Sequence, residues 1–301
     1  MPPRLAISLP LALLTGCATY EPKPLVPEKS AAAFDSRRLD APELRQFLEQ
    51  HLGPELKVWP PKHSQPWTLE TLTLAAYFHH TELPVARARW QTVQAAELTA
   101  GARPNPTLSA SPTFNFDAAS AVSPWKPVAN LDLPIETAGK RGLRLARAKQ
   151  QTEAARHEFF VAAWRVRSGV GTALEELHYS GQLASNAAGR ATFLKQLLDL
   201  TEQRQRAGEV SPAEVNAARL AHEKAKLEHV FTRERSATAR SRLAEAVGVP
   251  ASEFAELPIT FNHWTPLLSA AALAKLSEAA LLGRPDLRAA LASYEAAQLA
   301  L

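Results

Sequence analysis

The sequence predicts a mainly α-helical protein built on long antiparallel coiled-coil helices, with one two-stranded β-hairpin that could cross a membrane. Three observations lead to this fold class. About 70 residues after Gly139 contain no proline, which allows a helix of roughly 100 Å at 1.5 Å per residue. Apolar residues within that stretch repeat every seven positions. Directly before it, two segments alternate apolar and polar side chains, as β-strands do.

The N-terminus carries the pattern of a bacterial lipoprotein signal. Residues 1–16 contain the apolar run Leu5–Leu14, which is too short to span a membrane as a mature helix and fits a signal peptide. The run ends in Leu14-Thr15-Gly16-Cys17, which resembles the box whose cysteine is acylated. An ordinary signal peptide followed by a chance cysteine is the alternative. Ala18 replaces the aspartate that marks inner-membrane retention in such lipoproteins, so outer-membrane sorting is expected.

Residues 17–66 are expected to form a lipidated N-terminal tether. The tether contains many prolines, which favour an extended path along the outside of the main body, with one short helix at 41–51 capped by Asp40. Residues 67–103 then read as the first helix of the main body. Pro84 lacks a backbone donor, so we expect a break in this helix near 81–83.

Residues 104–135 are predicted to form a β-barrel hairpin. Each of its two strands is about ten residues long, which is the length that a tilted barrel strand needs to cross a bilayer. One face of each strand is apolar and the other is polar. The candidates for contact with lipid are Leu108, Ala110, Phe114, Phe116, Trp125, Ala129, Leu131 and Leu133.

Residues 136–250 are predicted to form a long coiled-coil hairpin. The seven-residue repeat comprises Val170, Leu177, Ala184, Ala191 and Leu198, with Ala173, Ala187 and Leu194 in the companion row and a gap at Ser180. Gly208 is expected to end the first helix in a left-handed conformation, and the sequence from Ser211 to Glu214 reads as a capping box with proline at the first helical position. The tip of the hairpin is therefore expected near Gly208.

Basic residues crowd the predicted start of the long helix. They are Lys140, Arg141, Arg144, Arg147 and Lys149. They either face lipid headgroups below the barrel or form a solvated helix face, and the second interpretation is favoured.

The C-terminal part of the chain repeats the first helix. After a linker at 251–269, residues 270–301 begin a second repeat: Pro285, Arg288 and Ala289 match Pro84, Arg87 and Ala88 at an offset of 201 residues. The chain stops inside this copy, before a second strand pair, and we expect it to be C-terminally truncated. One hairpin alone cannot close a barrel.

Taken together, the pieces resemble the TolC-type outer-membrane efflux family, nearest to its lipoprotein, heavy-metal-efflux-like branch. The pieces that carry the resemblance are Leu14–Cys17, Pro84–Leu98, Ala102–Ser109, Glu136–Arg141 and Arg206–Ser211. The resemblance implies that three protomers form a 12-stranded barrel on a helical tunnel through the periplasm. It further implies a homotrimer in contact with outer-membrane lipid, working with a periplasmic adaptor and an inner-membrane pump. By the same resemblance, the adaptor-docking and entrance tip comprises Arg204, Arg206, Gly208, Glu209, Ser211 and Glu214.

Other functional classes find little support in the sequence. The net charge of +4 is mild and its positive residues are spread among glutamates, so no nucleic-acid partner is expected. The chain has no Gly-rich phosphate loop and no ordered Ser-His-Asp set, and we expect neither an enzyme nor a cofactor. His222 and His229 lie seven residues apart, about 10 Å along a helix, which is too far for one metal ion.

Taken with this resemblance, the sequence predicts a lipid-anchored outer-membrane channel component of a tripartite RND-type efflux system, extending into the periplasm as a passive duct for small molecules or metal ions. The alternative is a non-conducting periplasmic coiled-coil lipoprotein that acts as a scaffold or as an adaptor-like interaction protein.

Overall fold

The structure is a computed structural model that describes residues 24–52, 66–116, 123–261 and 283–300, with Pro22, Leu276, Ala280 and Leu281. It separates into two compact units, one ending at Arg37 and one running from Arg38 to Leu301. In the first unit, helix α1 spans Pro27–Asp35. The expected signal peptide, the lipidation site Cys17 and parts of the expected linker and second repeat lie outside the described residues.

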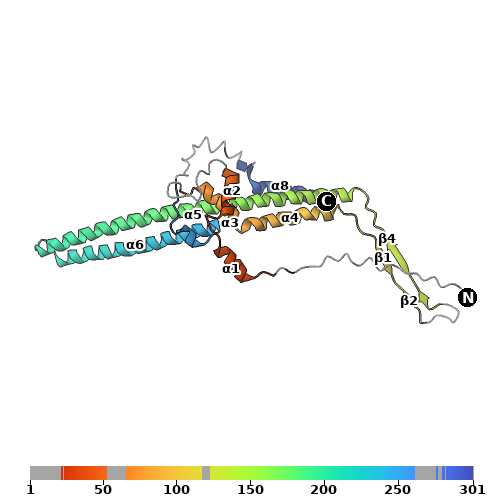
Figure 1. Cartoon of the computed structure of the whole chain (residues 1–301), viewed down its shortest axis with the longest axis horizontal. Helices are drawn as coiled ribbons and strands as arrows, with labels where there is room; N and C mark the ends of the chain where they lie inside the picture. Colours follow the sequence, from red (N-terminus) through yellow and green to blue (C-terminus); the bar gives the residue numbers. More distant parts are fainter. Residues whose placement is uncertain are drawn as a thin grey trace. The chain divides into compact units, whose positions relative to one another are not determined.

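Two long antiparallel helices dominate the second unit, which confirms the mainly α fold class. Helix α5 runs from Lys140 to Arg206 without interruption, and α6 (Pro212–Val247) returns beside its C-terminal half (Figure 1). The predicted seven-residue repeat lies at their contact: Val170, Leu177, Ala187, Ala191 and Leu198 are buried, whereas Ala184 and Leu194 are half-buried. Ser180, the polar residue in the repeat, is buried too and donates its hydroxyl to the Leu177 carbonyl at 3.1 Å.

The first helix of the main body is divided in two. Helix α3 spans Leu69–His79 and α4 spans Glu82–Gly101. Pro84 falls in the first turn of α4, where a missing backbone N–H leaves no helical hydrogen bond unmade. The expected break therefore lies at residues 80–81, just ahead of the proline.

Helix α8 (Pro285–Gln298) corresponds to α4 in the predicted internal repeat. Both α4 and α8 pack on the N-terminal half of α5 (Figure 1), and α8 buries Ala289, Ala292 and Ala296. The two copies of the repeated sequence thus share one supporting helix. Among the described residues, no helix combines the length and the apolar character that a membrane span requires.

The strand region is an antiparallel pair in four short pieces. Strand β1 (Thr107–Ala110) pairs with β4 (Ala129–Asp132), and β2 (Thr113–Phe114) pairs with β3 (Trp125–Lys126). The expectation of two continuous strands of about ten residues is therefore wrong in detail. Both ladders nevertheless share one register, because Ser111 donates to the Val128 carbonyl at 2.8 Å between them.

The interruption between the short strands falls at two prolines. The common register places Pro112 opposite Pro127, and neither residue has a backbone N–H. Ser111 and Val128 form a hydrogen-bonded pair, so the two prolines occupy the next, non-hydrogen-bonded pair. An N–H at either position would have pointed away from the partner strand. The prolines therefore remove no hydrogen bond between the two strands.

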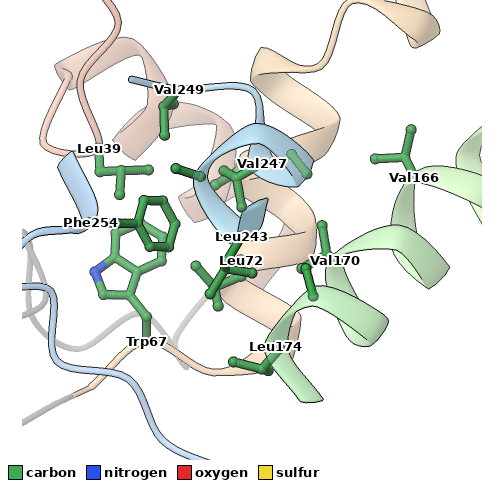
Figure 2. Close-up of a cluster of buried hydrophobic side chains, with 14 of the residues drawn as sticks. Leu39, Trp67, Leu72, Val166, Val170, Leu174, Leu243, Val247, Val249 and Phe254 are labelled. Carbon is green, nitrogen blue, oxygen red and sulfur yellow. The ribbon is translucent and has the colours of Figure 1, made fainter. Parts of the chain in front are cut away.

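The main hydrophobic core lies where α3, α5 and α6 meet the N-terminal segment. Figure 2 shows Trp67, Leu72, Val170, Leu243 and Phe254 gathered in it. The expected outside tether is wrong for residues 38–52, because Leu39 and two leucines of α2 (Pro42–Leu52) are buried in this core. The expectation of one helix in the tether is also wrong, since α1 precedes α2.

The segment after α6 is likewise more than a linker. The short 3-10 helix η2 (Ala251–Phe254) carries Phe254 into the core, where it is fully buried. Farther on, the backbone N–H of Trp67 donates to the Pro258 carbonyl at 2.8 Å, and the Trp67 carbonyl accepts from the Thr260 N–H at 2.9 Å. These two bonds form a parallel bridge between Trp67 and Ile259. The segments on either side of the long helices are therefore joined to each other.

Phe254→Ala should lower the free energy of unfolding by about 3–5 kcal/mol, because it leaves a cavity where a whole aromatic ring was buried. Urea unfolding followed by circular dichroism measures this loss. The matched control, Glu256→Ala in the same segment, changes an exposed side chain and should stay within about 0.5 kcal/mol. A loss below about 1 kcal/mol for Phe254→Ala would return this segment to the status of a solvated linker.

Candidate functional site

The strand pair has one continuous apolar face. Residues directly opposite each other in an antiparallel pair point to the same side, and the register pairs Leu108 with Leu131 and Phe114 with Trp125. The Phe114 and Trp125 rings pack edge to face, with centroids 5.0 Å apart. Leu108 is 74% exposed and Leu131 is 61% exposed, so this face lies uncovered by the residues that the structure describes.

The other face of the same strands is polar. It brings Thr107 opposite Asp132, Ser109 opposite Asn130 and Thr113 opposite Lys126. A strand pair with one apolar and one polar exposed face fits a boundary between an apolar medium and water. All eight predicted lipid-facing residues are described and exposed, namely Leu108, Ala110, Phe114, Phe116, Trp125, Ala129, Leu131 and Leu133. Their contact with lipid stays a prediction.

The tip of the long hairpin is a tightly hydrogen-bonded turn. Gly208 adopts a left-handed conformation with φ of 81°, and its N–H donates to the Gln205 carbonyl at 2.9 Å. The Glu209 N–H reaches the Arg204 carbonyl at 3.0 Å. These two bonds form the Schellman motif that ends a helix with glycine.

Helix α6 starts with the predicted capping box. The Ser211 hydroxyl accepts from the Glu214 N–H at 3.3 Å, and the Glu214 carboxylate accepts from the Ser211 N–H at 3.2 Å. Of the predicted docking residues, Ser211 and Glu214 therefore serve the helix start. Arg204 and Glu209 form an ion pair across the turn at 3.0 Å, and the Arg206 side chain is exposed. Docking of an adaptor at these residues stays a prediction.

Exposed apolar side chains line the coiled-coil hairpin above its tip. They are Phe193, Leu197 and Leu200 on α5 and Leu220, Leu227, Val230 and Phe231 on α6. A groove of about 570 Å³ lies between the two helices, and its apolar lining includes Phe193, Leu194, Leu220 and Ala221. Surface ion pairs flank it, with Arg190 to Glu228 and Arg219 to Glu202 both at 3.0 Å. Exposed pairs of this kind contribute little to stability, so the packing of the two helices rests on the buried repeat.

The neck of the strand region, where α4 ends and α5 begins, holds a polar cluster that the sequence did not predict. Arg144 donates from Nε to the Ala100 carbonyl at 2.8 Å and from Nη2 to the Ala102 carbonyl at 3.0 Å. It also forms a two-bond ion pair with Glu136. Arg141 donates from Nε to the Gly101 carbonyl at 2.6 Å.

These contacts correct the favoured interpretation of the basic residues for Arg141 and Arg144. Both side chains bind backbone carbonyls at the end of α4 instead of forming a purely solvated face. The hydrogen bond from Arg144 lowers the pKa of Glu136 below its usual range, and the charges of Arg144, Arg141 and Lys140 lower it further. Glu136 raises the pKa of Arg144 through the same bond. The pair is therefore fully charged across the neutral pH range. The only signal in the sequence was the run from Glu136 to Arg141, which does not reveal the partner carbonyls.

The described residues contain no group of three or more histidine, cysteine, aspartate or glutamate side chains able to hold a metal ion. His222 and His229, which the sequence placed on one helix face, are half-buried on the side of α6 that packs against α5.

Comparison with known proteins gives a family and a fold. Residues 76–249, more than half of the chain, match the family described as outer membrane efflux protein. No curated protein matches the chain. The fold is similar to that of VceC from Vibrio cholerae, with 23% identity and a TM-score of 0.62. It is also similar to the CmeC outer membrane channel of Campylobacter jejuni, with 14% identity and a TM-score of 0.60, and to the MtrE outer membrane channel of Neisseria gonorrhoeae, with 20% identity and a TM-score of 0.53.

Each of these three alignments covers 77% of the present chain. The chain spans only about half of its relatives, 57% of VceC, 51% of CmeC and 53% of MtrE.

Gly208→Ala should destabilise the protein by about 1–2 kcal/mol, because alanine pays a steric penalty at a positive φ. Gly189→Ala tests the opposite sign. Gly189 lies within α5, where an added Cβ meets nothing within 4 Å, so alanine should stabilise the helix by about 0.5–1 kcal/mol. Thermal unfolding of the two variants measures both effects. Equal effects of the two substitutions would contradict the assignment of Gly208 to a conformation that requires glycine.

Proposed function

The chain belongs to the outer membrane efflux protein family, and from this premise we propose that it is a channel component of a tripartite RND-type efflux system. In this proposal it is a homotrimer that provides a passive exit duct for small molecules or metal ions. The observation that carries the proposal is the register of the strand pair, which gives one continuous apolar face and one polar face. Because the family is one of efflux proteins, the expectation that the chain is not an enzyme is confirmed.

The strand pair supports the membrane part of the proposal. Each strand carries its apolar residues at every second position, and the register aligns those of both strands on one side. A bilayer accepts strands only when they close into a barrel, so the hairpin must pair with further strands. We propose that these come from further strand pairs of the same protein, and that Leu108, Phe114, Trp125 and Leu131 face the lipid.

The coiled-coil hairpin supports the assembly part of the proposal. Its large apolar side chains Phe193, Leu220 and Phe231 are each more than half exposed, which is typical of a surface that meets a partner when such residues are grouped. Neighbouring helical hairpins of the trimer would cover this surface and enclose a tunnel. The tip around Arg204, Arg206 and Glu209 would then contact the periplasmic adaptor, and an inner-membrane pump would supply the energy.

The lipoprotein box supports attachment to the membrane through Cys17. We propose that Cys17 is acylated, palmitate included, and that the protein resides in the outer membrane as in the heavy-metal-efflux-like branch of the family. A single acyl chain binds membranes only marginally, and more than one makes a stable anchor. The anchor and the hairpin would hold the same protein in the same membrane.

Leu131→Lys tests the membrane face of the hairpin. A cation on the lipid face of a barrel costs up to about 2–4 kcal/mol near the middle of the bilayer, whereas a substitution on the polar face is tolerated. Asn130→Lys is the matched control, since it places the same charge one residue away on the opposite face. Urea unfolding of the full-length protein in lipid vesicles should show the loss for Leu131→Lys alone. Similar losses for both variants, or none for either, would favour a surface hairpin that never enters the membrane.

The conduction step is tested by current. Purified full-length protein in a planar bilayer, supplied with its adaptor, should carry an ion current, because the duct would open when adaptor contacts relax the coiled-coil ends. The control is the adaptor alone. If the trimer forms but carries no current in the presence of its adaptor, the chain is a non-conducting coiled-coil lipoprotein that acts as a scaffold.

A further inference from the structure

The neck of the strand region contains a polar cluster that joins both limbs of the hairpin to both adjoining helices. We infer that Arg144, together with Arg141 and Glu136, is a positioning clamp that fixes the direction in which the hairpin leaves α4 and α5. The clamp rests on the geometry of the neck, and its importance for transport rests on the proposed function.

One side chain touches both limbs. Ala102 follows the last residue of α4 and begins the limb that leads to β1, and Arg144 Nη2 donates to its carbonyl at 3.0 Å. Glu136 lies in the limb that returns from β4 to α5, and Arg144 Nη2 also reaches its Oε2 at 3.2 Å. Arg144 itself belongs to the first turns of α5. A rotation of the hairpin about its neck would therefore break bonds to at least one limb.

The clamp also completes the end of α4. The last carbonyls of a helix have no partner within the helix, and a positive charge near them is favourable. Here the Ala100 carbonyl accepts from Arg144 and the Gly101 carbonyl accepts from Arg141. The planar guanidinium can serve several acceptors in a fixed geometry, which a lysine ammonium cannot do in the same way.

The backbone beside the clamp is strained. Ala138 has φ of 56°, in the left-handed region, and Gly139 follows with φ of 71°. An alanine in this region is disfavoured and persists where the surrounding structure fixes it. The strained turn lies between Glu136 and Arg144, so their ion pair closes a short loop around it. The return limb is thus held on both sides of the turn that leads into α5.

This arrangement opposes the interpretation of Arg144 as a contact for lipid headgroups. Its guanidinium donates to two carbonyls and one carboxylate of the same chain. Four of its five N–H groups are used by these bonds, so a headgroup could engage it fully only by displacing acceptors of the same chain. We therefore assign the Arg144 guanidinium to contacts within the protein's own neck. The experiment below also tests whether anionic lipid takes part.

The experiment measures the distance between the hairpin and α5 by pulsed electron spin resonance. Spin labels are placed at Ser109→Cys on the polar strand face and Lys149→Cys on α5, both exposed positions, in a Cys17→Ser background. The full-length protein is diluted with unlabelled chain, so that each trimer contains one labelled copy. The unchanged neck should give one narrow distance distribution. Arg144→Ala should widen it at least twofold, and Arg144→Lys and Glu136→Gln should widen it less.

Two controls keep the result interpretable. Arg156→Ala removes an arginine of α5 that pairs only locally with Glu153 in the described structure, and should leave the distribution unchanged. A second label pair, Gln94→Cys and Lys149→Cys, reports the packing of α4 on α5 and should stay narrow in every neck variant. If Arg144→Ala also widens the distance distribution of this second label pair, it has altered the packing of α4 on α5. The test of the clamp then rests on Arg144→Lys and Glu136→Gln, which change the clamp with little change in side-chain volume.

The proposal is overturned if Arg144→Lys and Glu136→Gln both leave the Ser109 to Lys149 distance distribution as narrow as in the unchanged protein. It is also overturned if the unchanged protein gives a narrow distance distribution only when anionic lipid is present, since that would assign the role to a headgroup. The readout does not require an ion current. If the protein carries no current but its neck variants widen the distance distribution as expected, the clamp is supported and the channel is contradicted. The two failures are therefore distinguishable.

Discussion

Close approach of several helices to one helix is the constraint on which the second unit depends. Helices α3, α4, α6 and α8 all contact α5. Half of the buried residues of α5 are alanines, and side chains this small let neighbouring helix axes come near on several sides at once. Larger residues such as Val170, Leu174 and Leu177 concentrate where α3 and α6 converge, and there the main core forms.

The regular parts of this fold could be predicted because they follow simple periods and local motifs. A period of seven located the contact between α5 and α6, and a period of two located the two faces of the hairpin. The tip followed from Gly208 and from the pair Ser211 and Glu214, whose partners lie within a few residues along the chain. The family followed from the order of these pieces, although no single one is specific.

The missed features depend on contacts between distant residues. Leu39 meets η2 through its N–H, which donates to Glu253 at 3.0 Å, and nothing in the local sequence around either residue indicates the other. Trp67 and Leu72 occupy the positions of a hydrophobic staple around Thr68, a local pattern that indicates the burial of Trp67. The neck cluster was missed for another reason. Arginines at a helix start resemble a solvated face until the carbonyls at the end of α4 are placed beside them.

The two ends of α5 are held in different ways from its body. Along the body, small buried residues pack without directional bonds, and the ion pairs between α5 and α6 are exposed. At the ends, directional hydrogen bonds fix the chain: the Schellman turn with its capping box at Gly208, and the arginine clamp at the neck. The buried seven-residue repeat keeps the two helices in register along the body, and the bonds at the ends fix how the chain enters and leaves α5. In the proposed duct, the contacts at the neck would hold the strands in place while the tip, at the other end of α5, meets the adaptor.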